Sequence, residues 1–156
     1  MNILFLASYF PSPDNTARGN WALEQATAFN QSHQTTVVCL GPWFPKAISP
    51  LSNSLRSYAN VPYRHNFGST RVYYPKWLYY PLHQVEKVTK VAPRFFLWLG
   101  WTSVRKKLDE LIATYTPDVI YAHHTLVNGY VAMKIKERYD IPFIVTDHEI
   151  GDYIKA

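Results

Sequence analysis

The side chains best suited to chemistry follow two apolar runs of the sequence. His123 and His124 follow one run, and Asp147, His148 and Glu149 follow the other. If both runs are parallel strands, these side chains meet at the carboxyl edge of a sheet, where open sheets bind ligands. Three interpretations stay open: imidazoles that only cap strand ends, a substrate pocket, or a metal site built from His123, His148 and Asp147 or Glu149. The spacing does not match an HExxH motif, so we favour a substrate pocket and expect no metal.

A glycine marks a further candidate position. Gly19 opens the first helical pattern, and a glycine there lets backbone N–H groups approach a phosphate, whose charge the helix dipole favours. The full GxGxxG fingerprint is absent, so NAD binding is not expected. The alternative is a glycine that only eases the turn into the helix.

These positions must be held by an alternation of strands and helices. The patterns predict strands at 2–7, 35–40, 70–74, 118–122 and 143–146, and helices at 19–31, 82–91, 95–115 and 125–139. The proline-rich stretch 43–66 lacks periodicity, and we expect a long irregular loop there. The alternation favours right-handed parallel crossovers. The expected fold class is therefore α/β, a Rossmann-like parallel sheet flanked by helices.

The composition fits one globular domain. The chain has 156 residues, of which 47% are hydrophobic and 17% charged, and this excludes an intrinsically disordered chain. No apolar run reaches the roughly 18–20 residues that span a bilayer. We interpret the apolar start as a buried strand rather than a cleaved signal peptide. The single cysteine, Cys39, cannot form an internal disulfide, which fits the cytoplasm.

Basic and aromatic residues gather in the middle of the chain. The formal net charge is +5, and residues 43–107 carry eleven Lys and Arg against one acidic residue, Glu86. Such a segment suggests an anionic partner: a membrane surface, nucleic acid or a phosphorylated substrate. The candidate membrane-surface residues lie on one predicted helix: Trp98, Trp101, Arg105, Lys106 and Lys107. They predict a peripheral position on the inner face of the membrane, with ordinary packing as the main alternative. No recognisable motif supports nucleic acid, which we do not expect as a partner.

Four stretches resemble the N-terminal, acceptor-side domain of a family 4 glycosyltransferase of the retaining GT-B type. They are ILFLASYFP at 3–11, RGNWALEQA at 18–26, PDVIYAH at 117–123 with Gly129 after it, and IPFIVTDH at 141–148. Their order and spacing follow the family. The stretch RVYYPKW at 71–77 further resembles members that build cell-surface polysaccharides.

The resemblance implies a function and a set of roles. It implies metal-independent transfer, without a cofactor, of a sugar from a nucleotide-diphosphate sugar to a glycan or lipid-linked acceptor. Residues 1–156 would then form a single Rossmann-like domain, the N-terminal half of a GT-B fold. The C-terminal nucleotide-sugar domain is absent from this chain, which alone is expected to be inactive. By the same resemblance His148 is catalytic, Gly19 faces the donor diphosphate, and His123 and Tyr9 line the acceptor side, with Asp152 as a further substrate-binding residue. The alternatives are a stand-alone module that binds phosphorylated ligands without transfer chemistry, and a metal hydrolase.

Overall fold

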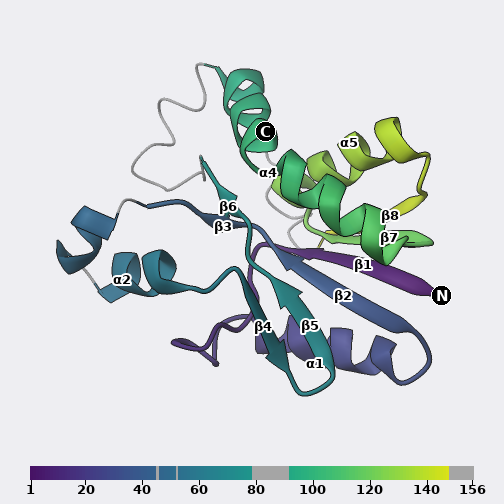
Figure 1. Ribbon diagram of the computed structural model, residues 1–156, viewed down its shortest axis with the longest axis horizontal. Coiled ribbons are helices and arrows are strands. Elements are labelled where there is room, and N and C mark those ends of the chain that lie inside the picture. The colour runs from purple at the N-terminus through teal and green to yellow at the C-terminus, as the bar shows by residue number, and fades with distance from the viewer. Residues whose placement is uncertain (45, 52, 79–91, 148–156) are drawn as a thin grey trace.

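The fold is a largely parallel sheet with helices on both faces. The computed structural model describes residues 1–44, 46–51, 53–78 and 92–147. The main sheet has six strands in the order β4-β5-β2-β1-β7-β8; β4 pairs antiparallel with β5, and the other neighbours pair parallel. The strands are β1 (Asn2–Ala7), β2 (Gln34–Cys39), β4 (Arg64–Phe67), β5 (Thr70–Tyr73), β7 (Val119–His123) and β8 (Phe143–Thr146). The expected Rossmann-like α/β class is confirmed (Figure 1).

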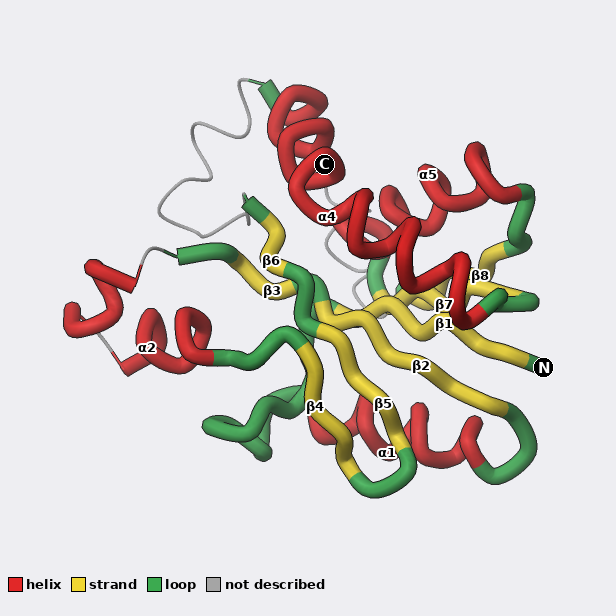
Figure 2. Tube along the Cα trace, in the orientation of Figure 1, coloured by secondary structure: helices red, strands yellow, loops and turns green. Residues whose placement is uncertain are grey.

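The described helices are α1 (Asn20–Asn30), α2 (Asn53–Asn60), α4 (Pro93–Tyr115) and α5 (Tyr130–Tyr139). Three of them, α1, α4 and α5, form two layers on the sheet (Figure 2), whereas α2 packs against a neighbouring turn. Figure 2 shows α1 on one face of the sheet and α4 with α5 on the other. A short parallel pair, β3 (Gly41–Pro42) and β6 (Lys76–Trp77), continues beyond the carboxyl ends of β2 and β5. The helix α2 and a 3-10 turn at Lys46–Leu51 lie between these two strands in sequence.

The first strand supplies side chains to two cores. Leu4 and Leu6 pack in the cluster under α4 and α5, whereas Phe5 and Ala7 pack in the cluster under α1. All four side chains are fully buried. A continuous apolar run is what a strand covered on both faces requires, because successive side chains point to opposite faces.

The strand order fixes where a ligand site is expected. The strand β1 has β2 on one side and β7 on the other. The chain therefore reverses its direction of winding between β1 and β7, and the loops after these strands diverge to opposite faces. In open α/β sheets, ligands bind at this switch point, beyond the carboxyl ends of the strands.

Two sequence predictions need correction. The irregular loop expected at 43–66 is wrong, because this stretch contains the 3-10 turn, α2 and the edge strand β4. The edge strand was missed because Arg64–Phe67 is short and polar, which is how natural edges avoid aggregation. The helix expected at 125–139 is regular only from Tyr130; Thr125–Gly129 forms an irregular turn with non-helical backbone. The helix predicted at 82–91 lies outside the described residues.

The membrane-surface assignment of Trp101 is also wrong. Its side chain is 8% exposed and belongs to the core cluster under α4. The neighbouring Gly100 lets the buried face of α4 pack closely against Trp77 of β6, because a Cβ at Gly100 would overlap the indole of Trp77. Trp98, by contrast, is 54% exposed, so one face of α4 packs and the other meets solvent.

Candidate functional site

The switch point brings together five residues from four segments. Tyr9 follows β1, Gly19 and Trp21 stand at the start of α1, His124 follows β7 and Asp147 follows β8. The His124 ring meets the rings of Tyr9 and Trp21 edge-on, with centroids 6.5 and 6.3 Å away. Its Nδ1 lies 3.9 Å from Oδ1 of Asp147. We call these five residues the switch-point site.

Gly19 sets the approach of α1 to the first loop. It caps the helix in a left-handed conformation, with φ +66°, and no described side chain caps the helix in its place. A Cβ at this position would lie 2.5 Å from the carbonyl carbon and oxygen of Tyr9. The fold itself therefore demands glycine here, which supports the structural interpretation; a contact with a donor diphosphate stays a prediction.

His123 is buried and helps to position the site. Its side chain is 1% exposed, and its Nε2 lies 2.6 Å from Oε1 of Gln25. The Gln25 amide donates from Nε2 to the Tyr121 hydroxyl at 2.9 Å, which leaves its Oε1 to accept from the imidazole. The Thr146 hydroxyl also donates to Tyr121, at 2.7 Å. This network ties α1, β7 and β8 together, and the predicted acceptor contact of His123 stays untested.

Asn128 locks two strand-end loops to each other. It is fully buried, and its amide donates to the Ser8 hydroxyl at 2.9 Å and to the His123 carbonyl oxygen. Ser8 follows β1, and His123 ends β7. Because a buried amide without these partners would be costly, the contact holds the two loops at a fixed separation.

The backbone after β7 is strained. His124 has φ 68° and ψ 143°, and Val127 has φ 66° and ψ −63°. Both pairs of dihedral angles are unfavourable for a residue with a Cβ, and Val127, which is β-branched, is a clear outlier. The strain is held by bonds from the His124 N–H to the Thr146 carbonyl, at 2.8 Å, and from the Gly129 N–H to the His124 carbonyl, at 3.2 Å. Such strain persists where surrounding structure enforces it, commonly at functional sites.

The strained segment presents His124 rather than His123 to the outside. The His124 side chain keeps 20% of its surface exposed, and Asp147 beside it keeps 16%. Thr125 fixes this carboxylate, because its hydroxyl donates to Oδ2 of Asp147 at 2.6 Å. An imidazole beside a held carboxylate can bind a substrate hydroxyl or carry a proton. Sequence reasoning counted His124 among the strand-end side chains suited to chemistry but assigned a role only to its neighbour His123.

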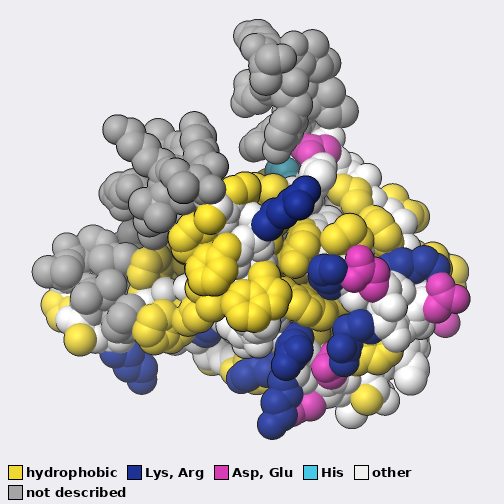
Figure 3. Space-filling model, turned by 90° about the horizontal axis from the view of Figure 1, so that it is seen from above, with side chains coloured by type: hydrophobic (Ala, Val, Ile, Leu, Met, Phe, Trp, Pro, Cys, Tyr) yellow, Lys and Arg dark blue, Asp and Glu magenta, His cyan; other side chains and the backbone are white. Residues whose placement is uncertain are grey.

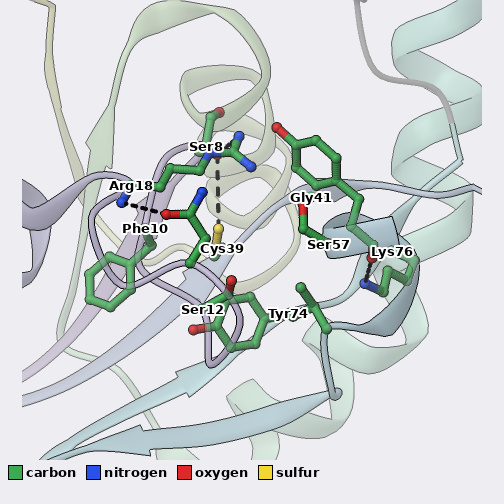
Figure 4. Close-up of a pocket in the computed structure, with 12 residues that line it drawn as sticks. Ser8, Phe10, Ser12, Arg18, Cys39, Gly41, Ser57, Tyr74 and Lys76 are labelled. Atoms are coloured by element: carbon green, nitrogen blue, oxygen red, sulfur yellow. Dashed lines mark hydrogen bonds between the residues drawn. The ribbon is translucent and has the colours of Figure 1, made fainter. Parts of the chain in front are cut away.

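A pocket adjoins the switch-point site. It is a small cavity of about 30 Å³ that opens to solvent, and Arg18 and Lys76 stand on two of its sides (Figure 4). Ser8, Cys39 and Tyr58 contribute to the same walls. The full lining is Ser8, Phe10, Ser12, Asn15, Arg18, Cys39, Gly41, Ser57, Tyr58, Val61, Tyr74 and Lys76. We call it the basic pocket, because none of these residues is acidic.

Burial perturbs the titratable groups of the basic pocket. Desolvation raises the pKa of the Cys39 thiol to about 11, although Arg18 and Lys76 oppose the rise. Desolvation also lowers the pKa of the Lys76 ammonium and raises the pKa of the Tyr58 hydroxyl. The thiol is therefore protonated at neutral pH and is no nucleophile.

The remaining predicted residues fall in different places. Tyr9 is 45% exposed at the rim of the switch-point site. His148 and Asp152 lie outside the described residues. Across the described ranges, no group of three His, Cys, Asp or Glu side chains is arranged to hold a metal ion.

The predicted membrane-surface residues lie on different sides of α4. Arg105, Lys106 and Lys107 are exposed, but the Lys107 ammonium stands 4.0 Å from the centre of the Tyr63 ring. Figure 3 shows hydrophobic side chains gathered on one face of the molecule, with both basic and acidic side chains beside them. In the part of the chain described, no helix is both long and apolar enough to cross a membrane.

Comparison with known proteins gives one structural likeness to report. No protein-family model matches the chain, and no curated protein sequence matches it. The chain is similar to the crystal structure of TcCGT1 in complex with UDP, at 15% sequence identity and a TM-score of 0.42. The likeness covers 93% of this chain but 28% of that chain, so this chain spans well under a third of its length.

Proposed function

We propose that this chain is the acceptor-side domain of a glycosyltransferase that uses a nucleotide-diphosphate sugar. One observation carries the proposal. The stretches that resemble family 4 glycosyltransferases are far apart in sequence, yet they fold into β1, α1, β7 and β8, and the three strands end, and the helix begins, at one edge of the sheet. Sequence resemblance that converges on a switch point is better explained by a shared site than by shared core packing.

The proposed roles follow the geometry of the switch-point site. The donor diphosphate lies against the start of α1, where the dipole favours negative charge and the first turn carries no acidic side chain. His124, oriented by Asp147, faces the acceptor hydroxyl that receives the sugar. His148 stays the proposed residue beside the reacting sugar. Transfer is proposed to be retaining and metal-independent, with most donor contacts supplied by a second, C-terminal domain.

The first test is transfer by the full-length protein. It should be assayed against a panel of nucleotide-diphosphate sugars with glycan and lipid-linked acceptors. His124→Gln should lower turnover at least about a hundredfold, since a positioned acid–base group contributes about 10²–10⁴-fold. The matched control is His33→Gln, because His33 is a partly buried histidine in the turn between α1 and β2, at the opposite edge of the sheet.

Two results would contradict the proposal. Saturable sugar-nucleotide binding without transfer to any acceptor would favour a phospho-ligand binding module. An equal loss of turnover in the His124→Gln and His33→Gln variants would show that the imidazole at the switch-point site has no special role. Melting curves of both variants separate a loss of turnover from a loss of fold.

We further propose that α4 docks on an anionic membrane surface. Phe95 and Trp98 are each 54% exposed, and their ring centres lie 5.9 Å apart. Arg94 and Arg105 are also exposed and share the Trp98 face, because they lie four residues before it and seven after it. Aromatic rings with flanking arginines suit the boundary between head groups and acyl chains. A lipid-linked acceptor would then lie near the carboxyl edge of the sheet.

A further inference from the structure

We propose that the basic pocket binds an oxyanion, a phosphoryl or carboxylate group carried by the acceptor. The assignment to an acceptor rests on the proposed function, but the binding itself rests on the pocket. Its basis is a pair of partly buried cations, Arg18 and Lys76, in a pocket whose described lining contains no acidic side chain.

Both cations are held by one residue of α2. The Arg18 guanidinium lies 4.5 Å from the centre of the Tyr58 ring and 4.9 Å from the centre of the Tyr9 ring. Lys76 donates from Nζ to the Tyr58 carbonyl oxygen at 2.7 Å. The two charges are therefore oriented before any ligand arrives, which reduces the entropy lost on binding.

The two cations of the pocket lack a carboxylate partner in the described part of the chain. Within those ranges, neither Arg18 nor Lys76 forms an ion pair with an acidic side chain. The contacts they do make are with aromatic rings and with carbonyl oxygens, including that of Ser8 at 3.5 Å from Nη2 of Arg18. Burying cations is costly unless an opposite charge compensates them. A bound oxyanion would supply that compensation.

The chemistry of the walls selects an oxyanion of small size. A guanidinium presents its donors as a planar fork that fits carboxylate and phosphate oxygens, and an ammonium adds a point charge. Serine hydroxyls line the pocket from the first loop and from α2. The cavity itself is small, about 30 Å³, and it opens to solvent, so it admits no more than one such group with the ligand's remainder outside.

The position of the pocket connects the anion to the switch-point site. The Tyr9 ring is close to a residue of each: the Arg18 guanidinium lies 4.9 Å from its centre, and the centre of the His124 ring lies 6.5 Å away. An acidic group held by Arg18 and Lys76 would point the rest of the molecule past Tyr9 toward His124. Lys76 belongs to β6, whereas the proposed donor diphosphate lies at α1, so Lys76 distinguishes the two anion sites.

The test measures binding of small anions to the purified chain by calorimetry at low salt. The probes are inorganic phosphate and glucuronate, with glucose as the neutral reference. We expect saturable binding of at least one anion, with a dissociation constant on the order of 1–10 mM, and none of glucose. Phosphate alone would identify a phosphoryl group, and glucuronate alone an acidic sugar.

Variants locate the binding. Lys76→Met and Arg18→Gln should each weaken it about tenfold or more, and Arg18→Lys should restore part of it. The controls Lys136→Met and Arg71→Gln remove the same kinds of charge from exposed positions on α5 and β5 and should leave the affinity within about twofold. If Lys76→Met does not fold, the wild-type protein with methylated lysines can be titrated by NMR. The Lys76 methyl signal should then shift saturably with the anion, while the Lys136 methyl signal should not.

The outcomes separate this inference from the proposed function. The anion site would be overturned if neither anion bound saturably, or if the pocket variants and the control variants lost the same amount of anion affinity. Binding that depends on Lys76, in a full-length protein that transfers no sugar, would keep the anion site and remove its assignment to an acceptor. If Lys76→Met leaves the rate of sugar transfer to an acidic acceptor unchanged, the pocket still binds an anion, but that anion does not belong to the acceptor.

Discussion

Replacing Gly19 by alanine should destabilise the fold more than replacing any glycine of similar backbone geometry. Two costs add at this position. A left-handed φ of +66° costs a residue with a Cβ about 1–2 kcal/mol. The Cβ would also lie 2.5 Å from the Tyr9 carbonyl, so the backbone between Tyr9 and Phe10 must move. Because Phe10 is 2% exposed, that movement disturbs the core, and the total should reach about 3 kcal/mol.

Two other glycines separate these costs. Gly68 has φ +56°, and a Cβ added there would meet no atom within 4 Å, so Gly68→Ala should cost about 1 kcal/mol from the backbone alone. Gly41 has no left-handed φ, and a Cβ added there would meet no atom. Gly41→Ala should therefore be neutral or stabilise the fold by up to about 1 kcal/mol, because alanine lowers the conformational entropy of the unfolded chain. The expected order of stability loss is therefore Gly19, then Gly68, then Gly41.

Urea unfolding followed by far-UV circular dichroism measures this series. The free energies of unfolding come from linear extrapolation, and an unchanged slope shows that the unfolding reaction is the same. Asparagine tolerates left-handed backbone, so Gly19→Asn should remove part of the first cost and keep the second. Equal losses for Gly19→Ala and Gly68→Ala would refute the argument from the Tyr9 contact.

Two further predictions concern burial and surface. The Cys39 thiol, whose pKa burial raises to about 11, should resist thiol reagents at pH 8 until the protein unfolds. The stability that its protonated form contributes is complete below the unfolded-state pKa of about 9 and is lost as pH rises from there to about 11, so unfolding free energies should fall across that window. Phe95→Ser with Trp98→Ser should weaken sedimentation with anionic vesicles about tenfold or more, whereas the equally exposed Ile144→Ser should not. Wild-type protein that shows no preference for anionic lipid would contradict membrane docking.

The sequence predicted the central strands well because burial on both faces leaves a clear signal. Asn2–Ala7 and Phe143–Thr146 have the predicted bounds, and β2 and β7 differ from theirs by one residue at each end. The small elements β3, β4 and α2 were missed, since two to eight polar or proline-containing residues carry no readable period. Their shape depends on packing against β5 and β6, which no local pattern contains.

The site was predicted in part, and the reason lies in backbone strain. The sequence indicated that the histidines gather at one edge, and β7 does end at His123. Periodicity predicted that a helix follows at once. The strained turn through His124 and Val127 instead buries one imidazole and exposes the next, which depends on tertiary contacts with Asp147 and the Thr146 carbonyl. The sequence could not predict the basic pocket either, because Arg18 and Lys76 lie 58 positions apart and only the fold brings them together.

The arrangement of rigid and exposed parts suggests how the site would respond to a ligand. Gly19 packs against the Tyr9 backbone, and Asn128 ties Ser8 to the His123 carbonyl, so the backbone of the two central loops is fixed by buried contacts. Polar side chains held in this way make binding geometry reproducible and cost little reorganisation. The rings of Tyr9 and Trp21, by contrast, each keep close to half of their surface in solvent. Ligand-dependent change should therefore be a rotation of these two rings over His124, rather than a movement of the strand ends that carry it.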